Sequence, residues 1–371
     1  MKLDPSQEHA ITRFLRALVD QQRARIVIPP IRDGDGCWFG GGNLVQTEDG
    51  SLWLTGRYRV YGDSRTGLKA GERGLEAALF RSNDGGKTFE KVRSWSKADL
   101  SRPGKTVLSI EGTALHQRPD QTWELFVSSE KDVSYPAGFQ AFQKPGTGVW
   151  SIDVMTGASP ETLDGGTLTD AVWSQEPDHL HVKDPNVFDS GGTTTMAFCT
   201  HPFSWASSNT GLAHRRADDA PFEVGVWDAF ARGNSWDVAA VRVTNVMRLP
   251  NLGLLTGAGD LAVLFYDGAE SLRSLDENPK AVSRPRGYSC EELGGAMVAP
   301  VRHIRDARKL SRHQAMFVSP HGTGSSRYLS TLVTQDAIYA TWQQAQPDGS
   351  QPLVINTLSM HEVEALLSDP S

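Results

Sequence analysis

The sequence contains few cysteines, no excess of positive charge and no long apolar run. Three cysteines, Cys37, Cys199 and Cys290, occur among 371 residues, and an odd, widely spaced set does not make a disulfide framework. The formal net charge of −7 argues against a nucleic-acid or anionic-membrane partner, because such partners favour a basic surface. No apolar stretch approaches the length that spans a bilayer. Residues 1–5 also lack the charged-then-apolar pattern of a signal peptide, so we expect a cytoplasmic protein.

Short apolar runs and turn signals fill most of the chain. Dipeptides such as Asp84-Gly85 and Asp267-Gly268 separate these runs, which is typical of an all-β protein with many short strands. The first residues differ, because the apolar residues of 5–23 recur at helical spacing behind Asp4 or Ser6 as a cap. We therefore expect a helical segment over residues 1–25 and one β domain over residues 26–371, with a short helix at 360–367.

One layout recurs through the β region: a polar or acidic cluster, an apolar strand, a turn and a second apolar strand. A long, weak period of this kind favours a β-propeller over a sandwich or barrel. We predict five blades, with six as the alternative. The repeats are expected to begin near Asp33 and Asp35, Glu111, Asp184, Arg248, and the pair Glu291 and Glu292.

The segment 82–89 has the spacing Ser-x-Asp-x-Gly-x-Thr-aromatic, with Asp84 as its acidic residue. This spacing resembles the Asp box of sialidase-like propellers. A short acidic side chain in such a hairpin turn accepts bonds from backbone N–H groups, and the glycines take positive φ. The motif therefore indicates architecture rather than catalysis, and one good copy is present where sialidases carry several.

A second resemblance lies in Lys183-Asp184-Pro185-Asn186-Val187-Phe188. It is similar to the Asp-Pro strand start of five-bladed glycosidases of the arabinanase, xylosidase and fructosidase type, although there it marks the first blade. The resemblance implies that three acids on separate inner strands act as base or nucleophile, orienting acid and general acid. It implies a glycoside hydrolase, and a cytoplasmic location favours an exo-acting enzyme on small oligosaccharides.

Four of the five predicted strand starts supply a candidate catalytic carboxyl group, and the remaining one lies near Arg248. Glu111 stands among small and apolar residues, and burial there would raise its pKa as a general acid requires. Asp35, or Asp33, is the candidate base or nucleophile, and Asp184 the residue that orients. One of Glu291 and Glu292 is expected to face the axial funnel and to compete for any of these roles.

Candidate substrate-binding residues surround these acids. Strand alternation places Arg57 and Arg59 on one face and Tyr58 on the other, and guanidinium groups beside aromatic rings suit sugars, particularly those with a carboxylate. No catalytic metal or cofactor is expected, although the axial channel could hold a structural divalent ion. The candidate set for substrate binding is Arg32, Trp38, Arg57, Tyr58, Arg59, His181, His201 and Arg286.

Two alternatives stay open. A lyase acting on uronic acid-containing sugars would use a His or Tyr base with an arginine, drawn from His181, His201, Tyr58 and Arg59. A non-catalytic propeller that binds glycans or proteins would instead have a funnel whose acids are ion-paired. The expected binding partner of the enzyme is a small oligosaccharide or glycoside substrate. The sequence leaves the oligomeric state open.

Overall fold

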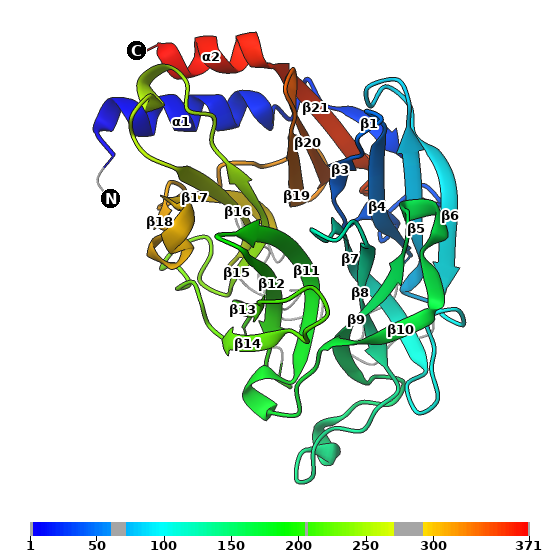
Figure 1. The fold of residues 1–371 in the computed structure, drawn as a ribbon. Coiled ribbons are helices and arrows are strands. Elements are labelled where there is room, and N and C mark those ends of the chain that lie inside the picture. The colour runs from blue at the N-terminus through cyan, green and yellow to red at the C-terminus, as the bar shows by residue number, and fades with distance from the viewer. Residues whose placement is uncertain (1–2, 61–71, 205–206, 271–291, 370–371) are drawn as a thin grey trace.

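The computed structural model describes residues 3–60, 72–204, 207–270 and 292–369. Five sheets surround a common axis as the five blades of a propeller (Figure 1). Four blades have four strands, and the inner strand of the first blade is divided into two short pieces. Apolar clusters fill the spaces between neighbouring blades, which is how each sheet buries both of its faces.

The blades follow one another along the chain. The first holds β2 (Trp38–Gly40), β3 (Leu44–Gln46), β4 (Leu52–Arg59), β5 (Gly74–Ser82) and β6 (Glu90–Ser96). The second holds β7 (Val107–Gln117), β8 (Trp123–Lys131), β9 (Val149–Gly157) and β10 (Asp164–Val172). The third holds β11 (His181–Ser190), β12 (Thr193–His201), β13 (Asn209–Arg215) and β14 (Glu223–Val226). The fourth holds β15 (Ala240–Arg248), β16 (Leu261–Ala269), β17 (Leu293–Pro300) and β18 (Arg308–Lys309).

The fifth blade closes the ring by using both ends of the chain. Its strands β19 (Ser326–Val333), β20 (Ala337–Gln344) and β21 (Leu353–Ser359) are completed by β1 (Arg25–Ile28), which pairs antiparallel with β21. Short 3₁₀ helices lie in the connections, at η1 (Gln140–Phe142), η2 (Pro160–Thr162), η3 (Pro177–His179), η4 (Gly253–Leu255) and η6 (Val301–Asp306). This pairing joins the two ends of the chain in one blade and so closes the ring.

Two helices lie side by side at the edge of the fifth blade (Figure 1). Helix α1 (Pro5–Leu18) is capped by Asp4, and α2 (Met360–Ser368) by Ser359. The apolar face of α1 is fully buried and shares one core with β20 and β21. The predicted helices are therefore present, but α1 ends at Leu18 rather than near residue 23, because the following residues turn to begin β1. Among the described residues, neither helix has the length and apolarity needed to cross a membrane.

The predicted repeats are correct for three blades and wrong for two. Inner strands β2, β7 and β11 begin near Asp33 and Asp35, around Glu111 and around Asp184. Arg248 is instead the last residue of β15, and Glu292 precedes β17, which is a third strand. The last two inner strands begin at Ala240 and Ser326, where the polar residues are arginines rather than acids. Acidic residues therefore do not mark these two strand starts.

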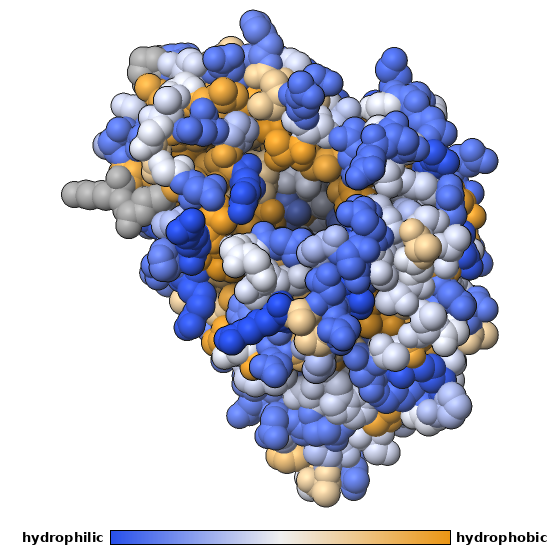
Figure 2. Space-filling view, viewed as in Figure 1, coloured by the Kyte–Doolittle hydropathy of each residue, from blue (hydrophilic) through white to orange (hydrophobic). Residues whose placement is uncertain are grey.

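Bulges interrupt the pairing of the inner strands soon after most of them begin. The register shifts between Ile110 and Thr113 in β7, Lys183 and Asn186 in β11, Val243 and Asn245 in β15, and Arg327 and Ser330 in β19. In two of these bulges a residue other than glycine has positive φ, namely Asp184 at 55° and Tyr328 at 54°. Bulges redirect side chains, and strained backbone of this kind gathers at functional sites. The face shown in Figure 2 is hollowed near the axis.

Candidate active site

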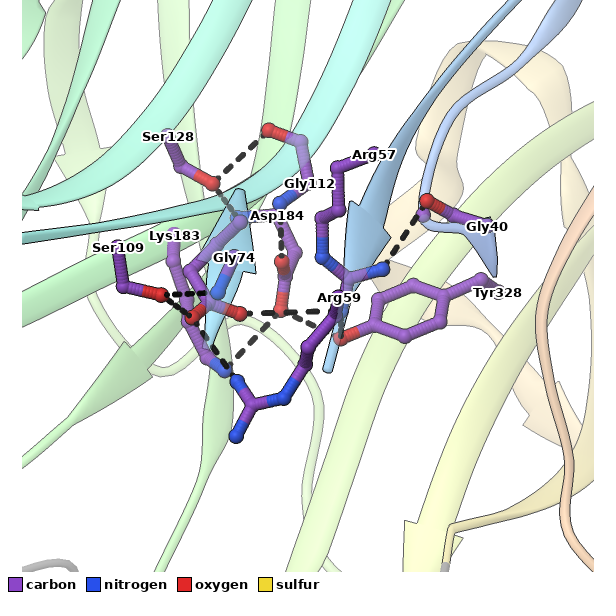
Figure 3. A network of polar contacts seen from close by, with 12 residues as sticks. Gly40, Arg57, Arg59, Gly74, Ser109, Gly112, Ser128, Lys183, Asp184 and Tyr328 are labelled. Carbon is purple, nitrogen blue, oxygen red and sulfur yellow. Dashed lines mark hydrogen bonds and ion pairs between the residues drawn. The ribbon is translucent and has the colours of Figure 1, made fainter. Parts of the chain in front are cut away.

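A connected polar network lies where the inner strands begin (Figure 3). It joins side chains of the first, second, third and fifth blades, with those of the first blade on β4, and we call it the axial cluster. Every member contacts another member through a hydrogen bond or an ion pair. The axial cluster consists of Arg57, Arg59, Glu111, Lys183, Asp184 and Tyr328.

Glu111 lies at the centre of the positive charge of the axial cluster. Its side chain is 3% exposed and accepts hydrogen bonds from Ser109 Oγ at 2.9 Å and Arg59 Nη1 at 3.2 Å. Arg57 Nη2 lies 3.7 Å from its other oxygen. Burial alone would raise the pKa of Glu111, but Lys183, Arg59 and Arg57 lower it to about 2. The predicted raised pKa is therefore wrong, and Glu111 is a carboxylate at neutral pH.

Asp184 is held on strained backbone by contacts from three blades. The Gly112 N–H donates to Asp184 Oδ1 at 3.0 Å, and the Tyr328 hydroxyl donates to Oδ2 at 3.4 Å. Lys183 Nζ lies 3.6 Å from the same oxygen. The Asp184 N–H donates to Ser128 Oγ on β8 of the preceding blade. These contacts fix the carboxylate beside Glu111, since Gly112 directly follows Glu111.

Tyr328 repeats the arrangement of Asp184 in the fifth blade. Its backbone N–H donates to Asp267 Oδ1 and Oδ2 at 3.2 and 3.1 Å. Asp267 on β16 therefore accepts from the backbone of Tyr328, as Ser128 on β8 accepts from the backbone of Asp184. Asp267 is 1% exposed, and burial raises its pKa to about 7. The site thus contains one carboxyl group with a lowered pKa and one with a raised pKa.

Arginines and an aromatic ring extend the axial cluster on its fifth-blade side. The guanidinium carbons of Arg59 and Arg327 lie 4.9 and 4.3 Å from the centre of the Trp38 ring. Glu292 forms ion pairs with both Arg242 and Arg327. Glu292 and Trp38 were predicted, whereas Arg242, Arg327, Tyr328 and Asp267 were not. Arg242, Arg327 and Tyr328 lie at the starts of inner strands, and Asp267 lies beside them on β16. A position at a strand start is therefore the sequence signal that could have identified the first three of these residues.

Other predicted residues lie apart from the axial cluster or outside the described chain. Asp33, Asp35 and Arg32 are exposed in the loop before β2, where the Gly34 N–H donates to Asp348. Tyr58 points away from the arginines, as predicted, and its ring centre lies 4.6 Å from that of Phe39. Glu291 and Arg286 lie outside the described residues.

The two predicted histidines are buried side by side in the third blade. His181 on β11 pairs in register with His201 on β12, and both are almost fully buried. Burial lowers the pKa of His181 to about 3 and that of His201 well below its usual value. The Nε2 atom of His181 lies 3.3 Å from the Tyr135 hydroxyl, and that of His201 lies 3.2 Å from Ser208 Oγ. Both rings are therefore neutral at physiological pH.

The axial cluster does not fit a divalent ion. In the described part of the chain, no three His, Cys, Asp or Glu side chains are grouped as metal ligands. Arg57 and Lys183 already neutralise the two central carboxylates, and their charge would repel a metal ion.

A substitution at Gly112 tests whether catalytic activity depends on the position of the Asp184 side chain. A Cβ at residue 112 would lie 2.6 Å from Asp184 Oδ1 and 2.9 Å from its Cα, so Gly112→Ala should displace Asp184 without removing a polar group. We expect a loss of about 100-fold in kcat/KM, the size of effect that a displacement near 1 Å produces. Gly165→Ala on β10 is the matched control, because its Cβ meets nothing closer than 3.4 Å. Equal activity of the two variants would contradict the prediction.

Comparisons with known proteins agree with the fold. No family model matches the chain, and no curated protein matches it. Solved structures do match. A β-1,2-mannobiose phosphorylase from Listeria innocua has a TM-score of 0.54 at 14% identity, covering 92% of this chain and 96% of that one. An α-L-arabinofuranosidase from Lactobacillus brevis has a TM-score of 0.53 at 12% identity, covering 89% and 92%.

A third solved structure, a GH43 endo-arabinanase from Bacillus licheniformis, has a TM-score of 0.50 at 10% identity, covering 90% of this chain and 97% of that one. At such identities the likeness concerns the fold. In fold, this chain is a five-bladed β-propeller similar to those of glycoside hydrolases.

Proposed function

We propose that the protein is a glycoside hydrolase whose reaction takes place at the axial cluster. The observation that carries the proposal is the convergence of Glu111 and Asp184, two buried carboxyl groups on neighbouring inner strands, one of them on strained backbone. Glycoside hydrolysis requires one carboxylate at the anomeric centre and one acid at the leaving oxygen. In this proposal Glu111 is the carboxylate, Asp184 lies beside it, and a third buried acid, Asp267, donates the proton. The shared fold supports the same conclusion by analogy.

On the basis of these pKa values we propose catalytic roles that differ from those predicted from the sequence. Glu111, ionised at neutral pH, acts on the anomeric carbon, either directly or through a water molecule, and stabilises the positive charge that develops there. Asp184, held by Gly112, Lys183 and Tyr328, orients the sugar beside it. The substrate stays the one expected from the sequence: a small oligosaccharide in the cytoplasm, cleaved from one end.

Asp267 is the proposed proton donor, because a general acid needs a pKa near the working pH. It contacts the backbone of Tyr328, whose hydroxyl contacts Asp184. We expect kcat/KM to fall above about pH 7, tenfold per pH unit, as Asp267 with its pKa of about 7 loses its proton. The pH profile of Asp267→Asn should lose this alkaline limb. An unchanged limb in that variant would exclude Asp267 as the acid.

The proposal is tested with 4-nitrophenyl glycosides of the common pentoses and hexoses. Because one structural neighbour is a phosphorylase, each assay is run with and without inorganic phosphate. Wild type should release nitrophenol from at least one glycoside without phosphate, and Asp184→Asn should lose about 100-fold or more. Asp33→Asn, in the exposed loop before β2, is the control and should keep full activity. Absence of turnover on the whole panel, or equal loss in both variants, would overturn the proposal.

One observation favours a second candidate, a glycan-binding propeller without catalysis. Its funnel should contain ion-paired acids, and Glu111 and Glu292 are both paired with arginines. It predicts saturable sugar binding with no product release. The lyase alternative loses support, because its candidate bases His181 and His201 are buried among protein groups and Tyr58 faces away from Arg59.

A further inference from the structure

A pocket of about 700 Å³ lies at the outer edge of the fourth blade, away from the axis. Its walls are the loop 229–234 that precedes β15, the end of η6 and the strand β18. The outer strand β18 has only two residues, Arg308 and Lys309, whereas β6 and β10 have seven and nine. The pocket therefore opens where a full outer strand would cover the sheet in another blade.

The charge of this pocket is opposite to that of the chain. The net charge of the protein is −7, yet the pocket lining contains no Asp or Glu. It contains Arg232, Arg305, Lys309, Arg312 and His313. Four of these five carry a permanent positive charge at neutral pH.

Much of this positive charge lacks a partner. Lys309 Nζ lies 2.7 Å from Asp237, which is buried beneath it, and Arg312 lies 3.9 Å from Glu8. The side chains of Arg232 and Arg305 are exposed, and among the described residues neither side chain forms a hydrogen bond or an ion pair. The Arg312 Nε donates to the Lys309 carbonyl at 3.2 Å, so one guanidinium is held in place at the rim.

The inner wall of the pocket is apolar. Phe230 and Met297 are buried side chains that belong to one core cluster, and Ala229 and Ala307 pack against it. A ligand that fills the pocket therefore meets an apolar surface on one side and several cations on the other. An anionic group attached to a ring satisfies both.

We infer that this pocket binds a small molecule that carries a phosphate group on an apolar ring or on the apolar face of a sugar. Arginine forks match the oxygens of phosphate, and a doubly charged phosphate interacts with several cations more strongly than a single carboxylate does. The pocket lies on an outer strand and the axial cluster on inner strands, so the two sites share no residue. Binding here does not depend on the proposed hydrolysis.

Phenyl phosphate is the probe, because it combines a phosphate with an apolar ring. Its binding is measured by titration calorimetry at low ionic strength, beside inorganic phosphate, phenol and benzoate. We expect phenyl phosphate to bind more tightly than all three, with a dissociation constant that rises with salt. Tighter binding of benzoate would mean that the site takes carboxylates and would overturn the assignment to phosphate.

Arg232→Gln and Arg305→Gln locate the binding. Both side chains are exposed and unpaired, so their removal should leave the thermal unfolding of the protein unchanged. Each should weaken phenyl phosphate binding about tenfold, the usual worth of one charged hydrogen bond. Arg302→Gln, on the same η6 segment but outside the pocket lining, is the matched control and should change binding less than twofold. Failure of wild type to bind, or equal weakening by the control, would overturn the inference.

Discussion

Replacing Glu111 by glutamine should reduce hydrolysis by about 10³-fold, within the range for a group that acts directly on the reacting atoms. The loss should be the same for a 4-nitrophenyl and a 2,4-dinitrophenyl glycoside. The 2,4-dinitrophenolate leaving group needs no proton. The dinitrophenyl substrate therefore restores the rate only in a variant that lacks the general acid. Glu111 is ionised, because Lys183, Arg59 and Arg57 outweigh its burial and lower its pKa to about 2. Asp267→Asn should show the opposite pattern, with activity restored on the dinitrophenyl substrate.

Folding must be checked in the same variant. Glu111→Gln leaves the guanidinium of Arg57, which is 1% exposed, without its nearest carboxylate, and buried unpaired charge is destabilising. Thermal unfolding and circular dichroism separate a misfolded protein from an inactive one. The control is Glu161→Gln, which breaks an exposed ion pair with Arg81 and should keep full activity. Recovery of Glu111→Gln on the dinitrophenyl substrate would return Glu111 to the role of general acid.

Replacing Glu124 by glutamine should destabilise the protein by about 3–5 kcal/mol, the cost of breaking a buried ion-pair network. Glu124 is fully buried on β8. Arg215 on β13 donates to both of its oxygens at 2.7 Å, and Arg118 lies 2.8 Å away. The His116 ring lies 3.2 Å from Glu124 and 3.2 Å from Asp189. The network therefore ties the second blade to the third, and glutamine leaves its cations without a counter-charge.

The pH dependence of stability follows from the same carboxylate. Burial alone would raise the pKa of Glu124, but Arg215, His116 and Arg118 lower it to about 2. A carboxyl group with a lowered folded-state pKa stabilises the fold above its unfolded pKa of about 4.5, and the stabilisation is lost as the pH falls through the folded value. Urea unfolding of wild type and Glu124→Gln should therefore differ most above pH 5 and converge towards pH 2. A difference that stays constant with pH would contradict this account.

The architecture could be predicted from short-range signals. Turn dipeptides, strand alternation and the helix caps are local, and they predicted an all-β chain with a helix at its start, whereas the propeller itself was predicted from the long recurring layout and the Asp box. The turn at 82–89 forms as expected, with Thr88 N–H donating to Asp84 at 3.0 Å. The alternation of Arg57, Tyr58 and Arg59 also holds, because strand geometry alone determines which side chains share a face.

The electrostatics of the site could not be predicted in this way. The burial of Glu111 could be inferred from its apolar neighbours, but its pKa depends on cations that β4 and β11 bring to it from distant parts of the chain. Asp33 and Asp35 illustrate the opposite difficulty. Acids in a glycine-rich turn look alike in sequence whether they face the axis or solvent, and here they are exposed. Tyr328 carries no local signal for its positive φ.

The most direct test of the central claim is a crystal structure of Glu111→Gln soaked with the glycoside that wild type hydrolyses best. The account predicts that the sugar lies over the axial cluster, with its anomeric carbon facing residue 111 and a hydroxyl bonded to Asp184. A sugar bound elsewhere, with Asp184 still closed against Tyr328 and Lys183, would contradict the account and place the reaction outside this cluster.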